Sequence, residues 1–235
     1  MTSNAPSPPP ADLASFIDHT LLAENATEDQ IRTAIQDAQE FGCASVCLRP
    51  EWVQLASSLL NSSATGITTV IAFPEGDTSL GSKVRESALA VSDGATELDL
   101  VINYTLLAQG LYEPVRREIQ AVRAAAPDLT LKVILETATL TDTQVALGCA
   151  ISSDAGANYV KTSTGYHPAG GATVHAVEIM TREVPHMGVK ASGGIRTRAE
   201  AEQFLAAGAT RLGISATRQI LSETPELEIE DGDVY

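Results

Sequence analysis

The segment Asn158-Tyr159-Val160-Lys161-Thr162-Ser163-Thr164-Gly165 is a short β-rich run that carries a lysine and then turns through three hydroxyl residues into a glycine. A similar segment, Gly188-Val189-Lys190-Ala191-Ser192-Gly193-Gly194, places its lysine 29 positions further along the chain. This spacing fits one strand, a crossover helix and the next parallel strand. The two lysines are therefore expected at matching ends of neighbouring strands, facing one site.

Six further β-rich segments are spaced so that a helix fits between each pair. The eight predicted strands are Phe16–Thr20, Ala44–Leu48, Ile67–Phe73, Glu97–Asn103, Leu131–Glu136, Asn158–Thr162, Met187–Ala191 and Arg211–Ile214. Repeated β-α units with short connections favour a parallel sheet, and eight of them favour a TIM (β/α)8 barrel, an α/β fold with outer helices. An open doubly wound sheet is the alternative, but no Gly-x-Gly-x-x-Gly motif follows the first strand.

Helical patterns separate the predicted strands. In chain order they run from the N-cap Thr27 to Gly42, over Glu51–Leu60 after Pro50, to about Ser92, over Pro114–Ala126, to about Ala155, over Thr173–Glu183, over Thr197–Ala207, and from about Ser215. An N-cap threonine, a helix-opening proline and a terminating glycine are typical helix boundaries.

The composition is that of a soluble globular protein, with 44% hydrophobic and 19% charged residues. A net charge of −15 argues against a nucleic-acid partner or an anionic membrane surface. No apolar run approaches the ~20 residues that span a bilayer. The three cysteines (Cys43, Cys47 and Cys149) lack metal-type spacing, and free thiols in a reducing cytosol are the simplest interpretation, which predicts a cytoplasmic protein.

We expect one domain over residues 13–222. Residues 1–12 include a proline-rich run without a basic residue or an apolar core, which predicts a disordered arm and not a signal peptide. Residues 223–235 are acidic and are predicted to form a flexible tail.

Only four of the 15 basic residues are lysines, and two of these lie at predicted strand ends. Arginine cannot be deprotonated at working pH, so only lysine can serve as an amine nucleophile. Mutual repulsion of Lys161 and Lys190, together with partial desolvation, would lower the pKa of one amine toward neutrality. Two ordinary surface lysines at loop edges are the alternative.

The strand Glu97–Asn103 alternates so that Asp99 faces the barrel interior while Leu98 and Leu100 face the covering helices. Asp99 is therefore a candidate to move a proton through water or to hold Lys190 charged; a structural ion pair is the alternative. Lys132, at the start or middle of its strand, is interpreted as an interior residue outside the catalytic set.

Several residues are expected to support this site. Asp18 and Thr20 lie at the end of the first strand, and His19 between them is expected near the site. Cys47 is a candidate at the end of the second strand, although a buried packing role is the favoured interpretation. Glu136 is expected to orient a hydroxyl or to pair with a basic residue.

Backbone amides after the last three strands indicate a phosphate site. Gly165, Gly193-Gly194 and Ser215 are spaced to form an anion-binding nest, and barrels often bind phosphate at their last two strands. Thr164 completes the predicted substrate-binding set. The residues alone thus predict a Schiff-base enzyme acting on a small phosphorylated carbonyl compound.

Three motifs together resemble the deoxyribose-phosphate aldolase family: Val160–Gly165, Val189–Arg196 and Glu97–Asn103. Ile17–Leu22, Ser45–Leu48 and Lys132–Thr137 extend the resemblance, which covers about residues 14 to 220 in the expected order. It implies a class I aldolase on a TIM barrel that reversibly cleaves 2-deoxy-D-ribose 5-phosphate to D-glyceraldehyde 3-phosphate and acetaldehyde, without metal or cofactor. A homodimer is also implied.

The resemblance also implies roles for single residues. Lys161 matches the Schiff-base lysine, Lys190 the second lysine of the proton relay, and Asp99 the acid/base carboxylate. The glycines named above and Ser215 match the phosphate-binding positions. Tyr235 is similar to a C-terminal tyrosine that assists proton transfer in some members.

The chain departs from the family at two places. Ala216 follows Ser215 where a second serine is common, and the loop Tyr166–Gly171 differs from many members. Two other functions therefore stay open: a transaldolase-like Schiff-base enzyme acting on another sugar phosphate, and a non-catalytic sugar-phosphate binder.

Overall fold

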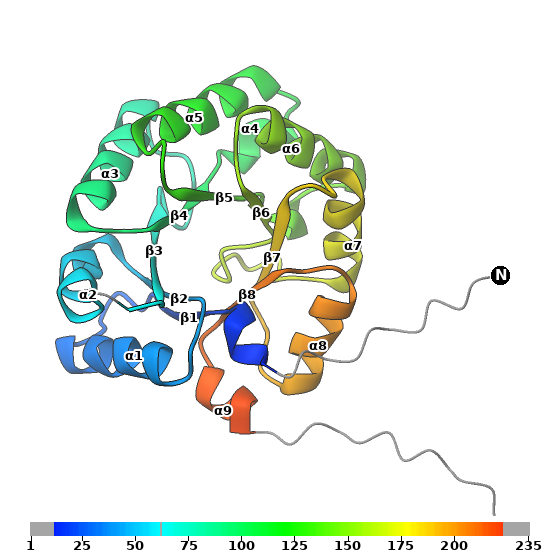
Figure 1. Ribbon diagram of the computed structural model, residues 1–235. Coiled ribbons are helices and arrows are strands. Elements are labelled where there is room, and N and C mark those ends of the chain that lie inside the picture. The colour runs from blue at the N-terminus through cyan, green and yellow to red at the C-terminus, as the bar shows by residue number, and fades with distance from the viewer. Residues whose placement is uncertain (1–11, 62, 223–235) are drawn as a thin grey trace, which may run out of the picture.

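Eight parallel strands close into a barrel in chain order, and helices cover its outside (Figure 1). The computed structural model describes residues 12–61 and 63–222. The strands are β1 (Ile17–Leu21), β2 (Ser45–Leu48), β3 (Gly66–Ile71), β4 (Glu97–Val101), β5 (Thr130–Ile134), β6 (Tyr159–Lys161), β7 (Gly188–Ser192) and β8 (Arg211–Ile214). The predicted TIM barrel is confirmed, and the open sheet is wrong because β1 pairs with β8.

The terminal predictions are not tested by this structure. Residues 1–11 and 223–235 lie outside the described residues, so the disordered arm, the acidic tail and the function of Tyr235 stay predictions.

Helices alternate with the strands as the sequence predicts. They are α1 (Glu28–Glu40), α2 (Val53–Leu59), α3 (Leu80–Asp93), α4 (Tyr104–Ala108), α5 (Tyr112–Ala125), α6 (Asp142–Asp154), α7 (Val174–Glu183), α8 (Arg198–Ala206) and α9 (Thr217–Ser222), with 3-10 turns η1 (Leu13–Phe16), η2 (Pro50–Trp52) and η3 (Thr137–Thr139). Thr27 caps α1 in a capping box with Gln30, as expected for an N-cap threonine.

Several local predictions need correction: β3 ends at Ile71 and β5 at Ile134, each two residues before the predicted end. The segment predicted as one helix over Glu51–Leu60 is the turn η2 followed by α2. Asn103, assigned to a strand, instead caps the unpredicted helix α4: its side-chain oxygen accepts a hydrogen bond from the Leu106 amide at 3.1 Å. Asparagine side chains readily satisfy the free amides of a helix start, which ends β4 two residues earlier than predicted.

The two faces of β4 are divided as the sequence predicts. Leu98 and Leu100 are fully buried in the apolar layer between strands and helices. Asp99 points the other way, into the barrel, where it contacts three lysine amines. The interior carries many polar groups, and Cys47 and Val70 form a small apolar cluster there with Leu22 and Phe73.

A second buried ion pair lies outside the barrel and connects α3 and α5 to the loops above β3 and β4. Lys83 donates hydrogen bonds to the carbonyl oxygens of Gly76 at 2.7 Å and Val101 at 3.1 Å, and to Glu118 Oε2 at 2.5 Å. Glu118 Oε1 accepts from the Asn103 amide at 2.7 Å. The two buried charges therefore bind the backbone at the end of β4, at Val101 and Asn103, which follow Asp99 in the chain.

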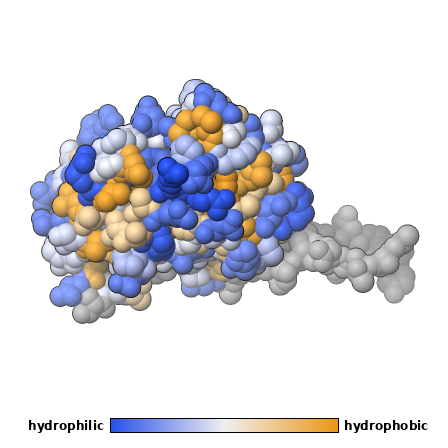
Figure 2. Space-filling view, turned by 90° about the horizontal axis from the view of Figure 1, so that it is seen from above, coloured by the Kyte–Doolittle hydropathy of each residue, from blue (hydrophilic) through white to orange (hydrophobic). Residues whose placement is uncertain are grey.

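The outer surface mixes polar and apolar groups. Figure 2 shows hydrophilic and hydrophobic residues interspersed on one side of the helical layer. Single apolar side chains such as Leu89 in α3 and Leu111 just before α5 are exposed, which is ordinary for a folded domain. Within residues 12–61 and 63–222, none of the helices is long and apolar enough to cross a membrane.

Replacing Lys83 with methionine is expected to lower the free energy of unfolding by about 3–5 kcal/mol, because Glu118 is left buried without its cation. Urea denaturation followed by circular dichroism measures this. The matched control is Arg117→Gln, which removes an exposed cation paired with Glu113 and should cost less than ~1 kcal/mol. Equal losses in the two variants would show that the buried pair does not stabilise the loops.

Candidate active site

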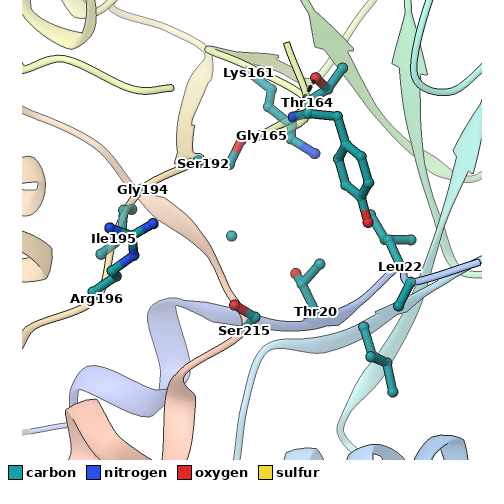
Figure 3. Close-up of a pocket in the computed structure, with 15 residues that line it drawn as sticks. Thr20, Leu22, Lys161, Thr164, Gly165, Ser192, Gly194, Ile195, Arg196 and Ser215 are labelled. Carbon is teal, nitrogen blue, oxygen red and sulfur yellow. Dashed lines mark hydrogen bonds between the residues drawn. The ribbon is translucent and has the colours of Figure 1, made fainter. Parts of the chain in front are cut away.

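A cavity of about 350 Å³ opens where the strands of the barrel end. Figure 3 shows the Lys161 amine pointing into this space from one side, while Thr20 and Ser215 lie on the opposite side. Lys161 is the last residue of β6, which explains why its side chain reaches the cavity floor from a rigid strand. Of the predicted site residues the cavity brings together Thr20, Lys161, Thr164, Gly165, Gly193, Gly194 and Ser215.

Asp99 lies beneath the cavity and contacts all three interior lysines. Its Oδ2 accepts from Lys161 Nζ at 2.7 Å and from Lys190 Nζ at 2.8 Å, and its Oδ1 accepts from Lys132 Nζ at 2.9 Å. Asp99 is fully buried, and so are Lys132 and Lys190. One carboxylate thus joins the cavity lysine to the other two cations.

A second carboxylate, Asp18, binds the other side of Lys190. Lys190 Nζ donates to Asp18 Oδ2, and Arg211 Nη1 donates to Asp18 Oδ1 at 2.6 Å. Asp18 is the second residue of β1 and is fully buried, so it lies deeper than the strand end where we expected it. Lys190 is therefore held between two carboxylates.

The two catalytic lysine candidates differ in protonation. Burial lowers the pKa of the Lys161 amine; Asp99 raises it and Lys190 lowers it again, and the result lies below the ordinary value. Burial also disfavours the charge on Lys190, but Asp18 and Asp99 outweigh it and raise its pKa. Lys161 is thus the amine that loses its proton more readily, and desolvation contributes more to this than the repulsion between lysines that we emphasised.

Asp99 and Asp18 stay ionised because of the same contacts. Burial opposes ionisation of both carboxyls, but the lysines around Asp99 hold its pKa well below its usual range. Lys190, Lys132 and Arg211 do the same for Asp18. The deep part of the site therefore consists of groups whose charged forms are favoured, and among the cations there Lys161 is the one whose charge burial disfavours on balance.

The backbones of Gly165, Gly171 and Gly193 pack against one another at the edge of the cavity and form the glycine rim. Gly193 has φ of +88°, and a β-carbon on it would lie 3.0 Å from the Gly171 Cα. A β-carbon on Gly171 would lie 2.1 Å from the Gly193 carbonyl oxygen. This close approach leaves the rim without side chains, next to Ser215 and Arg196 on the cavity wall. The arrangement suits an anion held by backbone amides, a hydroxyl and a guanidinium.

Glu136 positions Thr164 at the cavity wall. Its Oε2 accepts hydrogen bonds from the Thr164 hydroxyl at 2.6 Å and the Thr164 amide at 3.2 Å. Glu136 is fully buried and has φ of +56°, a backbone region that is costly for residues with a β-carbon. Of the two roles expected for Glu136, orienting a hydroxyl is the one observed; no ion pair with a basic residue is found in the described part of the chain.

Other expectations are settled by burial. Cys47 is fully buried in the small apolar cluster, and burial raises its thiol pKa to about 11, which fits packing and not thiolate chemistry. His19 is wrong as a residue near the site: as the neighbour of inward-facing Asp18 it points outward, where its Nδ1 lies 2.8 Å from Thr217 Oγ1. Thr20 lines the cavity and donates to the Asp18 carbonyl at 2.8 Å.

Sequence reasoning missed part of the charged network. Lys132, which the sequence indicates as an interior residue outside the catalytic set, contacts Asp99 and Glu97, and Arg211 contacts Asp18 and lies 3.5 Å from Glu97. Strand alternation places all of them on the interior face, so that signal was present in the sequence. The pairing itself was not, because strand register decides which interior charges meet.

A smaller cavity of about 110 Å³ adjoins the first. Thr164 and Tyr166 line both, and the smaller one continues past His167 and Tyr104. The Tyr166 ring packs edge-on against Phe73, with 5.1 Å between the centroids. The loop that departs from the family pattern thus forms the partition between the cavities, in a position to affect which substrates fit.

A TIM barrel whose cavity presents a buried lysine amine with a lowered pKa is typical of enzymes in which that amine attacks the carbonyl group of the substrate. The family model described as DeoC/LacD family aldolase matches residues 13–223. The chain belongs to this family and is an aldolase, a carbon–carbon lyase.

Named relatives are similar over nearly the whole chain. A deoxyribose-phosphate aldolase of Corynebacterium diphtheriae is 48% identical over 219 residues, covering 92% of this chain and 98% of the relative. A crystal structure of a putative deoxyribose-phosphate aldolase from Coccidioides immitis has a TM-score of 0.89 at 44% identity, covering 92% of this chain and 87% of that one. A tetrameric deoxyribose phosphate aldolase from Aeropyrum pernix has a TM-score of 0.83 at 36% identity, covering 89% of each chain.

Gly171→Ala is expected to weaken binding of inorganic phosphate by roughly tenfold, because the new methyl group displaces the Gly193 carbonyl and with it the amides of the rim. Isothermal titration calorimetry measures the affinity. Gly81→Ala in α3 is the control, since its β-carbon would meet only the tip of Arg85 at 3.4 Å. Unchanged phosphate affinity in Gly171→Ala would place the anion elsewhere.

Proposed function

We propose that this chain is a class I aldolase that reversibly cleaves 2-deoxy-D-ribose 5-phosphate to D-glyceraldehyde 3-phosphate and acetaldehyde. Membership of the aldolase family and the similarity to relatives named deoxyribose-phosphate aldolase support the substrate. The observation that carries the mechanism is the Lys161 amine, which enters the cavity with a lowered pKa.

The reaction begins when the neutral Lys161 amine adds to the C1 aldehyde of the open-chain sugar. Loss of water forms a protonated imine, which withdraws electrons from the adjacent carbon. The bond between C2 and C3 then breaks: its electron pair forms an enamine on Lys161, and the C3 hydroxyl loses its proton as glyceraldehyde 3-phosphate is released. Protonation of the enamine carbon and hydrolysis of the imine release acetaldehyde and restore the amine. This sequence of steps needs no metal or cofactor.

Lys190 and Asp99 are proposed to handle the protons with water. The raised pKa of Lys190 keeps it an ammonium that can donate a proton toward the oxygen expelled from the addition product. Asp99 contacts both lysine amines at under 3 Å, so a proton can pass between them through one carboxylate. Fixed strands hold this chain of contacts, which limits reorganisation during the reaction.

The phosphate of the substrate is proposed to bind at the glycine rim with Gly165, Gly193, Gly194 and Ser215. Arg196, which lines the same wall, adds a cation that we did not predict. Its guanidinium offsets the missing second serine at Ala216, because a charge-assisted hydrogen bond is stronger than one from a hydroxyl.

A homodimer located in the cytoplasm is also proposed. The family resemblance supports a homodimer, whereas the solved relative from Aeropyrum pernix is described as tetrameric, so light scattering after gel filtration is the deciding measurement. The three cysteines are free and buried, which supports a reducing compartment such as the cytoplasm. Fractionation of the source cells tests this.

Two other functions remain distinguishable by experiment. A transaldolase-like enzyme would use a ketose phosphate as its donor, where the proposed enzyme uses an aldehyde. A non-catalytic binder would not need an amine of lowered pKa, and it should tolerate Lys161→Arg.

Incubation with 2-deoxyribose 5-phosphate followed by borohydride reduction is expected to attach a stable adduct to Lys161, because reduction traps the imine. Peptide mass spectrometry locates it. Lys161→Arg should lose the adduct and nearly all cleavage activity, while Lys83, a lysine outside the barrel interior, stays unmodified in both proteins. A folded wild-type protein without an adduct would contradict the Schiff-base mechanism.

Deleting Val234 and Tyr235 is expected to slow proton exchange at the methyl group of acetaldehyde, since the family resemblance gives the C-terminal tyrosine a part in proton transfer. Deuterium incorporation followed by NMR measures this step separately from bond cleavage. Exchange at the wild-type rate in the deletion variant would remove Tyr235 from the mechanism.

A further inference from the structure

We propose that Arg211 and Glu97 are positioning residues of opposite sign that together set the charge state of Lys161: Arg211 favours the neutral amine and Glu97 favours the charged one. Neither residue lines the cavity, and their side chains are only 13% and 11% exposed. They can therefore affect Lys161 only through other charged groups. This inference rests on the proposed function, since it concerns how the attacking amine is made ready.

The charges inside the barrel balance when Lys161 is left out. The described interior contains three carboxylates and, besides Lys161, three cations, and these six groups are Asp18, Glu97, Asp99, Lys132, Lys190 and Arg211. A proton on Lys161 would therefore leave one uncompensated positive charge in a closed, desolvated space. Such a charge is costly, so the neutral amine is favoured.

Other groups that face this network add no charge. The Cys47 thiol on β2 stays protonated because burial raises its pKa to about 11. On β3, Thr68 contributes a hydroxyl, which lies 3.3 Å from Lys132 Nζ. On β6, the Tyr159 ring packs under the Arg211 guanidinium at 5.6 Å from its centroid. Among the side chains in direct contact, the balance thus depends on the three carboxylates and three cations; Glu136 is also buried, but its Oε2 binds the amide and hydroxyl of Thr164.

Arg211 acts through Asp18 and Lys190. Asp18 divides its negative charge between Arg211, on Oδ1, and Lys190, on Oδ2. Without Arg211, Asp18 would neutralise Lys190 more completely, and Lys190 would repel a proton on Lys161 less. Lys190 and Lys161 are register partners on neighbouring strands, so this change is felt at short range.

Glu97 acts through Lys132 in the opposite sense. Lys132 Nζ pairs with Glu97 Oε2 and lies 2.9 Å from Asp99 Oδ1. Without Glu97, the charge of Lys132 would be compensated mainly by Asp99. Less of the negative charge of Asp99 would then remain to stabilise a proton on Lys161. Removing Glu97 should therefore favour the neutral amine, whereas removing Arg211 should favour the charged one.

The test compares Arg211→Gln with Glu97→Gln. Brief pulses of acetic anhydride at a series of pH values, read by peptide mass spectrometry, report the ionisation of the Lys161 amine without any turnover. The midpoint, which is the pH at which Lys161 is labelled at half its maximal rate, should rise by about one pH unit in Arg211→Gln. It should fall by about one unit in Glu97→Gln. The double variant should return close to the wild-type midpoint, because it restores the balance.

Controls separate charge from folding and from catalysis. Arg211→Lys keeps the charge and should keep the wild-type midpoint, even if its altered geometry lowers the melting temperature. Arg117→Gln removes an exposed cation and should leave the midpoint unchanged. Shifts in the same direction, or none, in folded Arg211→Gln and Glu97→Gln would overturn the inference. Because labelling needs no substrate, this result stands apart from whether 2-deoxyribose 5-phosphate is cleaved.

Discussion

The burial of three carboxylates inside a closed barrel is the constraint on which this structure depends. Asp18, Glu97 and Asp99 have lost most of their contact with water, and each must be compensated by a cation on a neighbouring strand. Side chains from β1, β4, β5, β7 and β8 supply the carboxylates and their cations. Parallel register brings these side chains within contact distance, so the closed sheet and the charge network require each other.

The reactive amine is a consequence of this network. In the described interior, Asp18, Glu97 and Asp99 are matched in number by Lys132, Lys190 and Arg211, and Lys161 lies at the end of β6 where the cavity begins. Lys190 differs from it by its position between Asp18 and Asp99, which keeps it charged. Two lysines at equivalent places on adjacent strands thus have pKa values shifted in opposite directions, which suits the proposed division into an amine nucleophile and an acid.

The buried pair of Lys83 and Glu118 extends the same principle to the loops. Their charged groups form hydrogen bonds with the backbone of Gly76, Val101 and Asn103 and so stabilise the segments at the ends of β3 and β4. At the opposite side of the cavity the glycine rim is held by close backbone packing, where a side chain would not fit. The proposed chemistry therefore lies on strands, and the proposed phosphate site lies on the segments that follow β6, β7 and β8.

The sequence by itself determined the barrel, the two lysines and the inward direction of Asp99, because strand alternation and β-α spacing are local patterns. It also placed the glycines that form the rim. Only the tertiary structure decided that Asp99 contacts three lysines, that Lys132 and Arg211 belong to the network, and that His19 faces away from the site. Those facts depend on the register between strands and on burial, which arise when distant segments of the chain meet.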